Sequence, residues 1–283
     1  MAFSMLPWIA IVLALLVLAT IVVAVVARRG PGERAVDVAD LTTRYPVVML
    51  HGIMGFDEIG VARWKQTYFR GIAEHLQSRG AIVYRPRLPA MSSIPERAER
   101  LASFLRTLPV ERVNIIAHSM GGLDARYAIA RLAAGDKVAS LITIGTPHFG
   151  TPLADFKDSL PGAALRRLAG GIGVNVDGFQ WLTVDSMSRF NAEVFDDDRV
   201  LYACVVTRAK PATGINPLLL PSEAYLRRRA GSNDGIVPAT SQRWGEVLME
   251  IDADHYAQVG WTNTFDAAAL YANIVETLRT RGY

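Results

Sequence analysis

Apolar positions along the chain follow two different periods. Short uninterrupted apolar runs, typical of strands buried on both faces, alternate with stretches whose apolar residues recur at helical spacing. The predicted strands are residues 47–50, 81–84, 113–117, 139–144 and 200–206. The predicted helices are residues 64–76, 95–108, 119–132 and 265–278. This alternation predicts an α/β fold, with a mostly parallel sheet covered by helices on both faces and joined by right-handed crossovers.

The alternation breaks between residues 151 and 191. A glycine cluster (Gly170, Gly171 and Gly173) lies there among scattered apolar residues such as Phe179 and Trp181. A stretch of this length and composition predicts an insertion over the sheet, a candidate lid. We expect a single domain over residues 45–283, preceded by a linker at residues 30–44 that is rich in glycine, proline and charge.

The N-terminal segment is apolar enough to be a membrane anchor. Residues 7–27 carry no charge over 21 positions, which as a helix would span the roughly 30 Å hydrocarbon core. No basic residue precedes them and the apolar stretch exceeds that of a signal peptide, so we expect an uncleaved single-pass anchor over residues 1–29. The positive-inside rule, applied to Arg28, Arg29 and Arg34, favours a cytoplasmic domain. Cleavage after Ala27 would instead give a secreted or periplasmic protein.

Composition narrows the partners and cofactors. The 30 basic residues exceed the 27 acidic ones by 3 and are scattered, so no nucleic-acid partner is predicted. The one dense basic cluster after the anchor, residues 227–229, is interpreted as a solvated helix face. A single cysteine, Cys204, excludes an intrachain disulfide and is expected in the core. No spacing of histidine and cysteine indicates a metal site.

The most informative stretch is residues 113–122 (VNIIAHSMGG). It predicts a buried strand, a sharp turn carrying Ser119, and a helix. Small residues two positions before and after that serine, here Ala117 and Gly121, are typical of a nucleophile elbow, where the backbones pass closely. The helix N-terminus would supply N–H groups to a developing oxyanion. The alternative is that Ser119 only caps the helix.

A second loop complements this turn. Residues 51–55 (HGIMG) directly follow the first predicted strand, at the strand end where active-site crevices form in parallel sheets. Their backbone could donate a second hydrogen bond to an oxyanion. The alternative interpretation of the glycines is a tight turn.

A nucleophilic serine needs a histidine base and an orienting carboxylate. Among five histidines, His255 follows an apolar run late in the chain, as the base does in enzymes with this elbow, and His148 fits less well. Asp234, in a loop between serine and histidine, is the candidate acid, although Asn-Asp-Gly is also an ordinary turn. Asp252 and Asp254 are rivals that lie very close to His255 in sequence.

Taken together, these motifs resemble the bacterial true lipases of the Pseudomonas and Burkholderia type. The matching stretches are residues 45–57 (YPVVMLHGIMGFD), 113–122, 144–152 (IGTPHFGTP), 189–192 (RFNA), 233–237 (NDGIV) and 254–255 (DH). The resemblance implies an α/β-hydrolase fold and hydrolysis of long-chain acylglycerol esters. It implies Ser119 as nucleophile, Asp234 as acid and His255 as base, with the backbone N–H groups of Ile53 and Met120 as the oxyanion hole.

Other predicted roles concern the lid and the substrate site. The insertion after residue 151 resembles the family's lid region, and Leu218 and Leu219 are expected to shape an acyl pocket. The remaining candidates for the substrate site are His51, His148 and His118, although the side chain of His118 should point away from the nucleophile.

Two departures from the family concern cofactors and crosslinks. The family's structural calcium uses an aspartate two positions after the histidine, where this chain has Ala257, and an Asp-Pro-Ser-Asp stretch that here is residues 220–223 (LPSE). An apolar side chain cannot ligate a hard cation, so we expect neither calcium nor any other cofactor. The family disulfide cannot form with one cysteine.

The expected activity is therefore carboxylic-ester hydrolysis on acyl lipids through an acyl-enzyme. An acyltransferase, a phospholipase or a thioesterase would use the same three residues. From other classes, a catalytically silent membrane-tethered scaffold and a cytosolic binding domain stay open.

Overall fold

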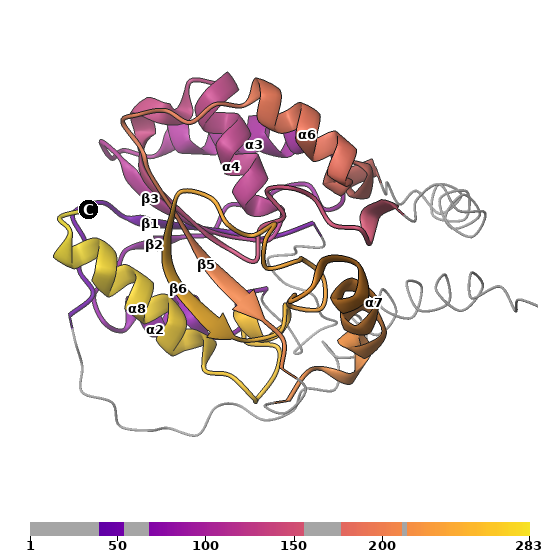
Figure 1. The fold of residues 1–283 in the computed structure, drawn as a ribbon. Coiled ribbons are helices and arrows are strands. Elements are labelled where there is room, and N and C mark those ends of the chain that lie inside the picture. Colours follow the sequence, from indigo (N-terminus) through magenta and orange to yellow (C-terminus); the bar gives the residue numbers. More distant parts are fainter. Residues whose placement is uncertain (1–39, 54–67, 156–176, 211–213) are drawn as a thin grey trace, which may run out of the picture.

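The computed structural model describes residues 40–53, 68–155, 177–210 and 214–283. One parallel sheet of six strands, in the order β2-β1-β3-β4-β5-β6, organises these residues (Figure 1). The strands are β1 Val47–Leu50, β2 Val83–Tyr84, β3 Val113–His118, β4 Val138–Ile144, β5 Leu201–Arg208 and β6 Glu246–Asp252. The predicted α/β class with a parallel sheet is confirmed.

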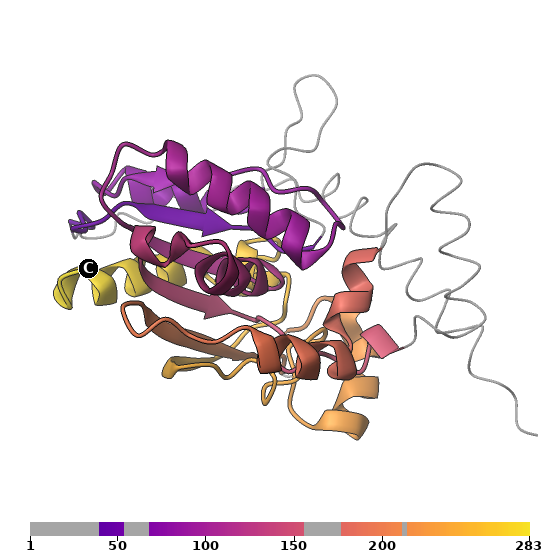
Figure 2. The ribbon, with the colours of Figure 1, turned by 90° about the horizontal axis from the view of Figure 1, so that it is seen from above.

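Helices cover both faces of the sheet (Figures 1 and 2). The helices are α2 Ile72–Gln77, α3 Ile94–Thr107, α4 Gly121–Arg131, α6 Val184–Glu193, α7 Leu220–Ala230 and α8 Ala267–Thr280. Helices α2 and α8 pack on one face, where Met49 of β1 contributes to the core, and α3 and α4 pack on the other, where Leu50 does so. The period of two in β1 thus feeds two separate cores.

Three elements differ from the prediction, and the first is the strand expected over residues 81–84, which is the shorter Val83–Tyr84. The helix predicted over residues 64–76 begins only at Ile72, because Gly71 adopts a left-handed φ of 69° immediately before it. Residues 64–67 lie outside the described part. The strand β6 was not predicted, because its exposed positions include Glu246 and Glu250 and break the apolar run.

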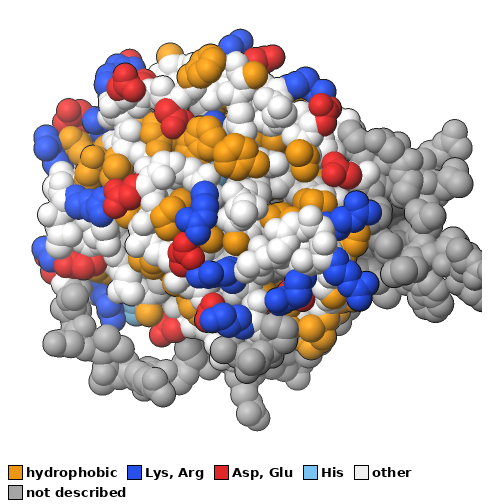
Figure 3. All heavy atoms as spheres, in the orientation of Figure 1, with side chains coloured by type: hydrophobic (Ala, Val, Ile, Leu, Met, Phe, Trp, Pro, Cys, Tyr) orange, Lys and Arg blue, Asp and Glu red, His pale blue; other side chains and the backbone are white. Residues whose placement is uncertain are grey.

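Strand β6 forms one edge of the sheet, and charged side chains cover it. Glu250 pairs with Arg208 and Arg243, and Glu246 pairs with Arg281 of the chain's C-terminal end. Acidic and basic groups are interspersed on the face of the molecule that Figure 3 shows. Charges of this kind protect an edge strand from pairing with a second chain.

Two expectations fall wholly or mostly outside the described residues. The anchor predicted over residues 1–29 and most of the insertion, residues 156–176, lie there. Within the described ranges no helix is both long and apolar enough to cross a membrane.

Candidate active site

Ser119 lies on a strained turn at the carboxyl end of β3. Its φ is +55°, a left-handed conformation that few residues other than glycine adopt. Its N–H donates to the carbonyl of Ile144 at the end of β4 (2.9 Å), which fixes the turn against the neighbouring strand. Strain of this kind is typical of the nucleophile elbow, where it holds the serine side chain out of the sheet.

The glycine after this turn permits a close approach of α4 to β1. A Cβ on Gly121 would lie 2.8 Å from the carbonyl oxygen of His51 and 3.0 Å from that of Leu50. Gly52 serves the same purpose from the other side, since a Cβ there would lie 2.8 Å from the Cβ of Ser119. The loop after β1 therefore lies directly against the serine.

A buried arginine holds that loop from behind. Arg97 of α3 is fully buried and donates from Nη2 to the carbonyl oxygens of His51 (2.8 Å) and Gly52 (3.2 Å). Its Nε donates to the equally buried carboxylate of Asp124 on α4 (2.8 Å). Burial raises the pKa of Asp124 to about 6, although Arg97 opposes the shift. With its carbonyls drawn toward Arg97, the loop is fixed relative to both helices.

His255 and Asp234 form a buried pair beside the serine turn. His255 Nδ1 lies 2.8 Å from Asp234 Oδ2, and the backbone N–H groups of Ile236 (2.9 Å) and Val237 (2.7 Å) donate to Oδ1. Burial alone would raise the pKa of Asp234, but His255, Val237 and Gln258 together lower it. Because the carboxylate only accepts hydrogen bonds, His255 Nδ1 carries the proton and Nε2 is left as the basic nitrogen.

The rival aspartates have other partners. Asp252 lies on the exposed end of β6 and pairs with Lys210. Asp254 accepts hydrogen bonds from the backbone of Tyr256 and Ala257 (both 2.9 Å) and of Asn216 (2.8 Å). Asp254 therefore ties the histidine loop to residue 216 and is not an orienting partner of His255.

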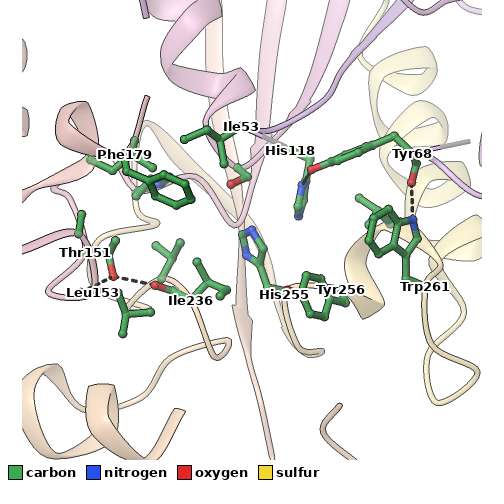
Figure 4. Close-up of a pocket in the computed structure, with 16 residues that line it drawn as sticks. Ile53, Tyr68, His118, Thr151, Leu153, Phe179, Ile236, His255, Tyr256 and Trp261 are labelled. Carbon is green, nitrogen blue, oxygen red and sulfur yellow. Dashed lines mark hydrogen bonds between the residues drawn. The ribbon is translucent and has the colours of Figure 1, made fainter. Parts of the chain in front are cut away.

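An apolar cavity of about 140 Å³ joins these groups. Ser119, His118 and His255 line it together with the side chain of Ile53 (Figure 4). The other described residues that line it are Tyr68, Pro147, Thr151, Leu153, Ala154, Phe179, Leu182, Ile236, Val237, Tyr256, Val259 and Trp261. Such a lining excludes water and suits an aliphatic or aromatic substrate.

Several predicted site residues lie away from this cavity. His148 is buried, its ring stacks on Trp244, and Thr143 and Arg126 contact its nitrogens. His51 is likewise buried, and its Nε2 accepts from the N–H of Leu88 (3.1 Å). Neither histidine lines this cavity, so the structure gives no support to the substrate contacts predicted for these two residues.

The two leucines expected in an acyl pocket also lie outside the lining. Leu219 is fully buried against Gly235 in the acid loop, and Leu218 lies beside it in the short helix Pro217–Leu219. Both precede α7, and Leu219 supports the loop of Asp234. The sequence alone does not distinguish packing against the acid loop from lining the cavity, because both surroundings are apolar.

Met120 and Ile53, the predicted oxyanion residues, both lie beside Ser119, and their role as N–H donors stays a prediction. Met120 follows Ser119 at the N-terminal end of α4, and Ile53 follows Gly52 in the loop after β1, where its carbonyl accepts from Met91 (2.7 Å). Their backbones thus flank the serine from two different elements, as an oxyanion hole of two donors demands.

Three polar residues at the site were missed by sequence reasoning. Arg97 interrupts the helical face of α3, and Tyr68 and Gln258 lie in segments without a motif. Gln258, in the turn Ala257–Val259, donates to Asp234 Oδ2 (2.9 Å). Tyr68 accepts from the N–H of Gly52 (3.0 Å). Only Arg97 could have been found from the sequence, because it is a charged residue within the apolar stripe of a predicted helix.

The described residues contain no group of three histidine, cysteine or acidic side chains that could hold a metal ion. Ala257, at the position of the family's calcium ligand after the histidine, is buried with 1% of its surface exposed. The expectation that no calcium binds stays a prediction.

The architecture is that of the α/β hydrolases. A family model described as the alpha/beta hydrolase fold matches residues 45–183. Mature Bacillus licheniformis lipase BlEst2 aligns with a TM-score of 0.66 at 22% identity, over 87% of this chain and 96% of that one. The metagenomic carboxyl esterase MGS0156 aligns with a TM-score of 0.73 at 18% identity, over 90% and 82%. The chain therefore has the α/β-hydrolase fold.

Curated proteins similar to this chain in sequence include triacylglycerol lipases. Triacylglycerol lipase 2 of Saccharomyces cerevisiae is 33% identical over 208 residues, which are 69% of this chain and 63% of that protein. The Pseudomonas fragi enzyme is 25% identical over 86% of this chain and 98% of its own length, and the Burkholderia plantarii enzyme 40% identical over 40% and 32%. The chain thus spans less than two thirds of the yeast relative. The resemblance to bacterial lipases is confirmed.

Proposed function

We propose that this protein is a serine carboxylic-ester hydrolase that acts on acyl lipid esters. The observation that carries the proposal is the strained Ser119 at an apolar cavity that the Asp234–His255 pair also reaches. The triacylglycerol lipases among its relatives support an acyl ester as the substrate. The apolar lining of the cavity supports an acyl chain as the group bound there.

The reaction proceeds in two steps, acylation of Ser119 and hydrolysis of the acyl-serine. His255 Nε2 takes the proton of Ser119 as Oγ adds to the ester carbonyl, and the N–H groups of Ile53 and Met120 bind the oxyanion. The imidazolium then gives that proton to the departing alcohol, which leaves an acyl-serine. Water attacks the acyl-serine with His255 again as base, releasing the acid and Ser119. Throughout, Asp234 holds the tautomer and stabilises the imidazolium.

The test is hydrolysis of p-nitrophenyl esters over a range of chain lengths. We expect Ser119→Ala to lower kcat by about 10⁴-fold or more. Ser78→Ala, a serine at the exposed end of α2, is the matched control and should retain full activity. A serine-directed fluorophosphonate should label the wild-type chain and Ser78→Ala but not Ser119→Ala. A folded chain that neither cleaves any ester nor reacts with the probe would refute the proposal.

Two further properties are proposed with this activity. The enzyme works without calcium, since Ala257 offers no ligand, so excess chelator should leave the rate unchanged. Residues 1–29 anchor it in a membrane as a single span, with the catalytic domain on the cytoplasmic side. Carbonate extraction of membranes and protease accessibility check the anchor and its side, and release of the full chain by carbonate would contradict the anchor.

A further inference from the structure

A buried row of hydrogen bonds connects the loop after β1 with the acid loop after β5. The N–H of Gly52 lies 3.0 Å from the hydroxyl of Tyr68, and that hydroxyl lies 2.7 Å from His118 Nδ1. His118 Nε2 lies 3.0 Å from Gln258 Oε1, and Gln258 Nε2 lies 2.9 Å from Asp234 Oδ2. Four hydrogen bonds thus join two loops that are distant in sequence. In Figure 4, His118 lies between Tyr68 and His255.

The carboxylate fixes the direction of every bond in this row. Asp234 can only accept, so the Gln258 amide donates to it and turns its carbonyl oxygen toward His118. That carbonyl also only accepts, so His118 carries its proton on Nε2. A neutral imidazole then has an acceptor at Nδ1, to which Tyr68 donates. The Tyr68 oxygen is left to accept from Gly52.

The three residues between Gly52 and Asp234 are buried and uncharged. His118 and Gln258 expose at most 1% of their surface, and Tyr68 exposes 9%. Burial, with His255 at a ring-centroid distance of 4.5 Å, holds the pKa of His118 well below its ordinary value. Burial raises the pKa of Tyr68, so the phenol keeps the proton that it donates. Neutral His118 has one proton to place, and Gln258 determines where it goes.

We propose that Tyr68, His118 and Gln258 are positioning residues that couple the oxyanion loop to the catalytic acid. Gly52 precedes Ile53, whose N–H binds the oxyanion, and Asp234 orients the base. The row therefore fixes the position of the oxyanion loop relative to the acid loop. The inference rests on the proposed ester hydrolysis. Its consequence is that Tyr68 and Gln258 act as one unit although they do not touch each other in the row.

The test is a double-mutant cycle on the full chain with a p-nitrophenyl ester. We expect Tyr68→Phe and Gln258→Leu each to lower kcat about tenfold with KM unchanged, the effect of one orienting hydrogen bond. Since either change breaks the same row, the double variant should also lose about tenfold, not a hundredfold. Tyr271→Phe is the matched control, because it removes the hydroxyl of another buried tyrosine that lies outside the row. It should leave kcat unchanged in the wild-type chain and in the Gln258→Leu variant.

A second measurement reports on His118 without turnover. In histidine labelled with ¹⁵N, the full chain in detergent should show His118 neutral at pH 7 with its proton on Nε2. Gln258→Leu should abolish that preference. A His118 proton on Nδ1, or single losses that multiply in the double variant, would overturn the inference. A wild-type chain that cleaves no ester would instead overturn the proposed function.

Discussion

Arg97 is the residue whose loss the structure penalises most clearly. Its guanidinium donates to Asp124 and to the carbonyl oxygens of His51, Gly52 and Pro89, and none of its side chain reaches solvent. Arg97→Met would keep the length of the stem but leave a buried carboxylate without its cation. Breaking a buried pair from one side costs about 3–5 kcal/mol of unfolding free energy. We expect that loss here.

Urea unfolding followed by circular dichroism measures it. Arg189→Met is the control, because Arg189 pairs with Asp185 across one helical turn with both side chains mostly exposed, and should cost less than about 0.5 kcal/mol. Arg97→Met/Asp124→Asn should recover part of the loss, since it removes the unpaired charge. An Arg97→Met variant as stable as the Arg189→Met control would refute the reasoning.

The cost should also depend on pH with a definite sign. Burial already raises the pKa of Asp124 to about 6 beside Arg97, and without the guanidinium the pKa rises further. A carboxyl whose pKa is higher in the folded state than in the unfolded state binds its proton more readily when folded. The free energy of unfolding therefore rises as the pH falls from above the folded pKa toward the unfolded pKa. The penalty of Arg97→Met should therefore be smaller at pH 5 than at pH 8.

Two other outcomes are expected. Gly121→Ala should lower stability by about 1–3 kcal/mol, and kcat with it, because the new methyl group meets the carbonyl of His51 at 2.8 Å; urea unfolding and ester hydrolysis check this. Burial and Arg126 hold the pKa of His148 well below its ordinary value, so the unfolded chain binds a proton there below pH 6.5 and stability falls as the pH drops. Between pH 6.5 and 5.5, His148→Gln should lose about 1 kcal/mol less than wild type, and equal slopes would contradict the burial argument.

The parts of the fold that the sequence predicted are those whose pattern is local. The strand before Ser119 and the helix after it follow from an apolar run, a sharp turn and an amphipathic stripe, and both lie within two residues of the predicted bounds. Strand β6 was missed because Glu246 and Glu250 interrupt its apolar residues, of which Leu248, Met249 and Ile251 pack against the core. Charged residues such as Glu246 and Glu250 are typical of a loop. Their partners Arg208 and Arg281 come from other segments, and only the structure shows these pairs.

The candidate site divides in the same way. Ser119, Asp234 and His255 stand in motifs whose order along the chain is informative, whereas Tyr68 and Gln258 gain their significance only from the neighbours that folding supplies. His148 shows the opposite error. A histidine after a strand end looked like a cavity residue, yet its ring packs on Trp244, some hundred residues later in the chain. Long-range packing decides such cases, and a single sequence does not contain it.

The strand order has a consequence for how the protein is made. Ser119 leaves β3 near the middle of the sheet, but His255 follows β6, the last strand to be synthesised and the one at the edge. Because chains emerge from the ribosome N-terminus first, the elbow exists well before the base that would activate it. A chain interrupted before β6 therefore carries a serine without its base. Ser119 becomes a reactive nucleophile only after β6 has joined the sheet and positioned His255. Labelling of Ser119 would therefore indicate that the whole domain has folded.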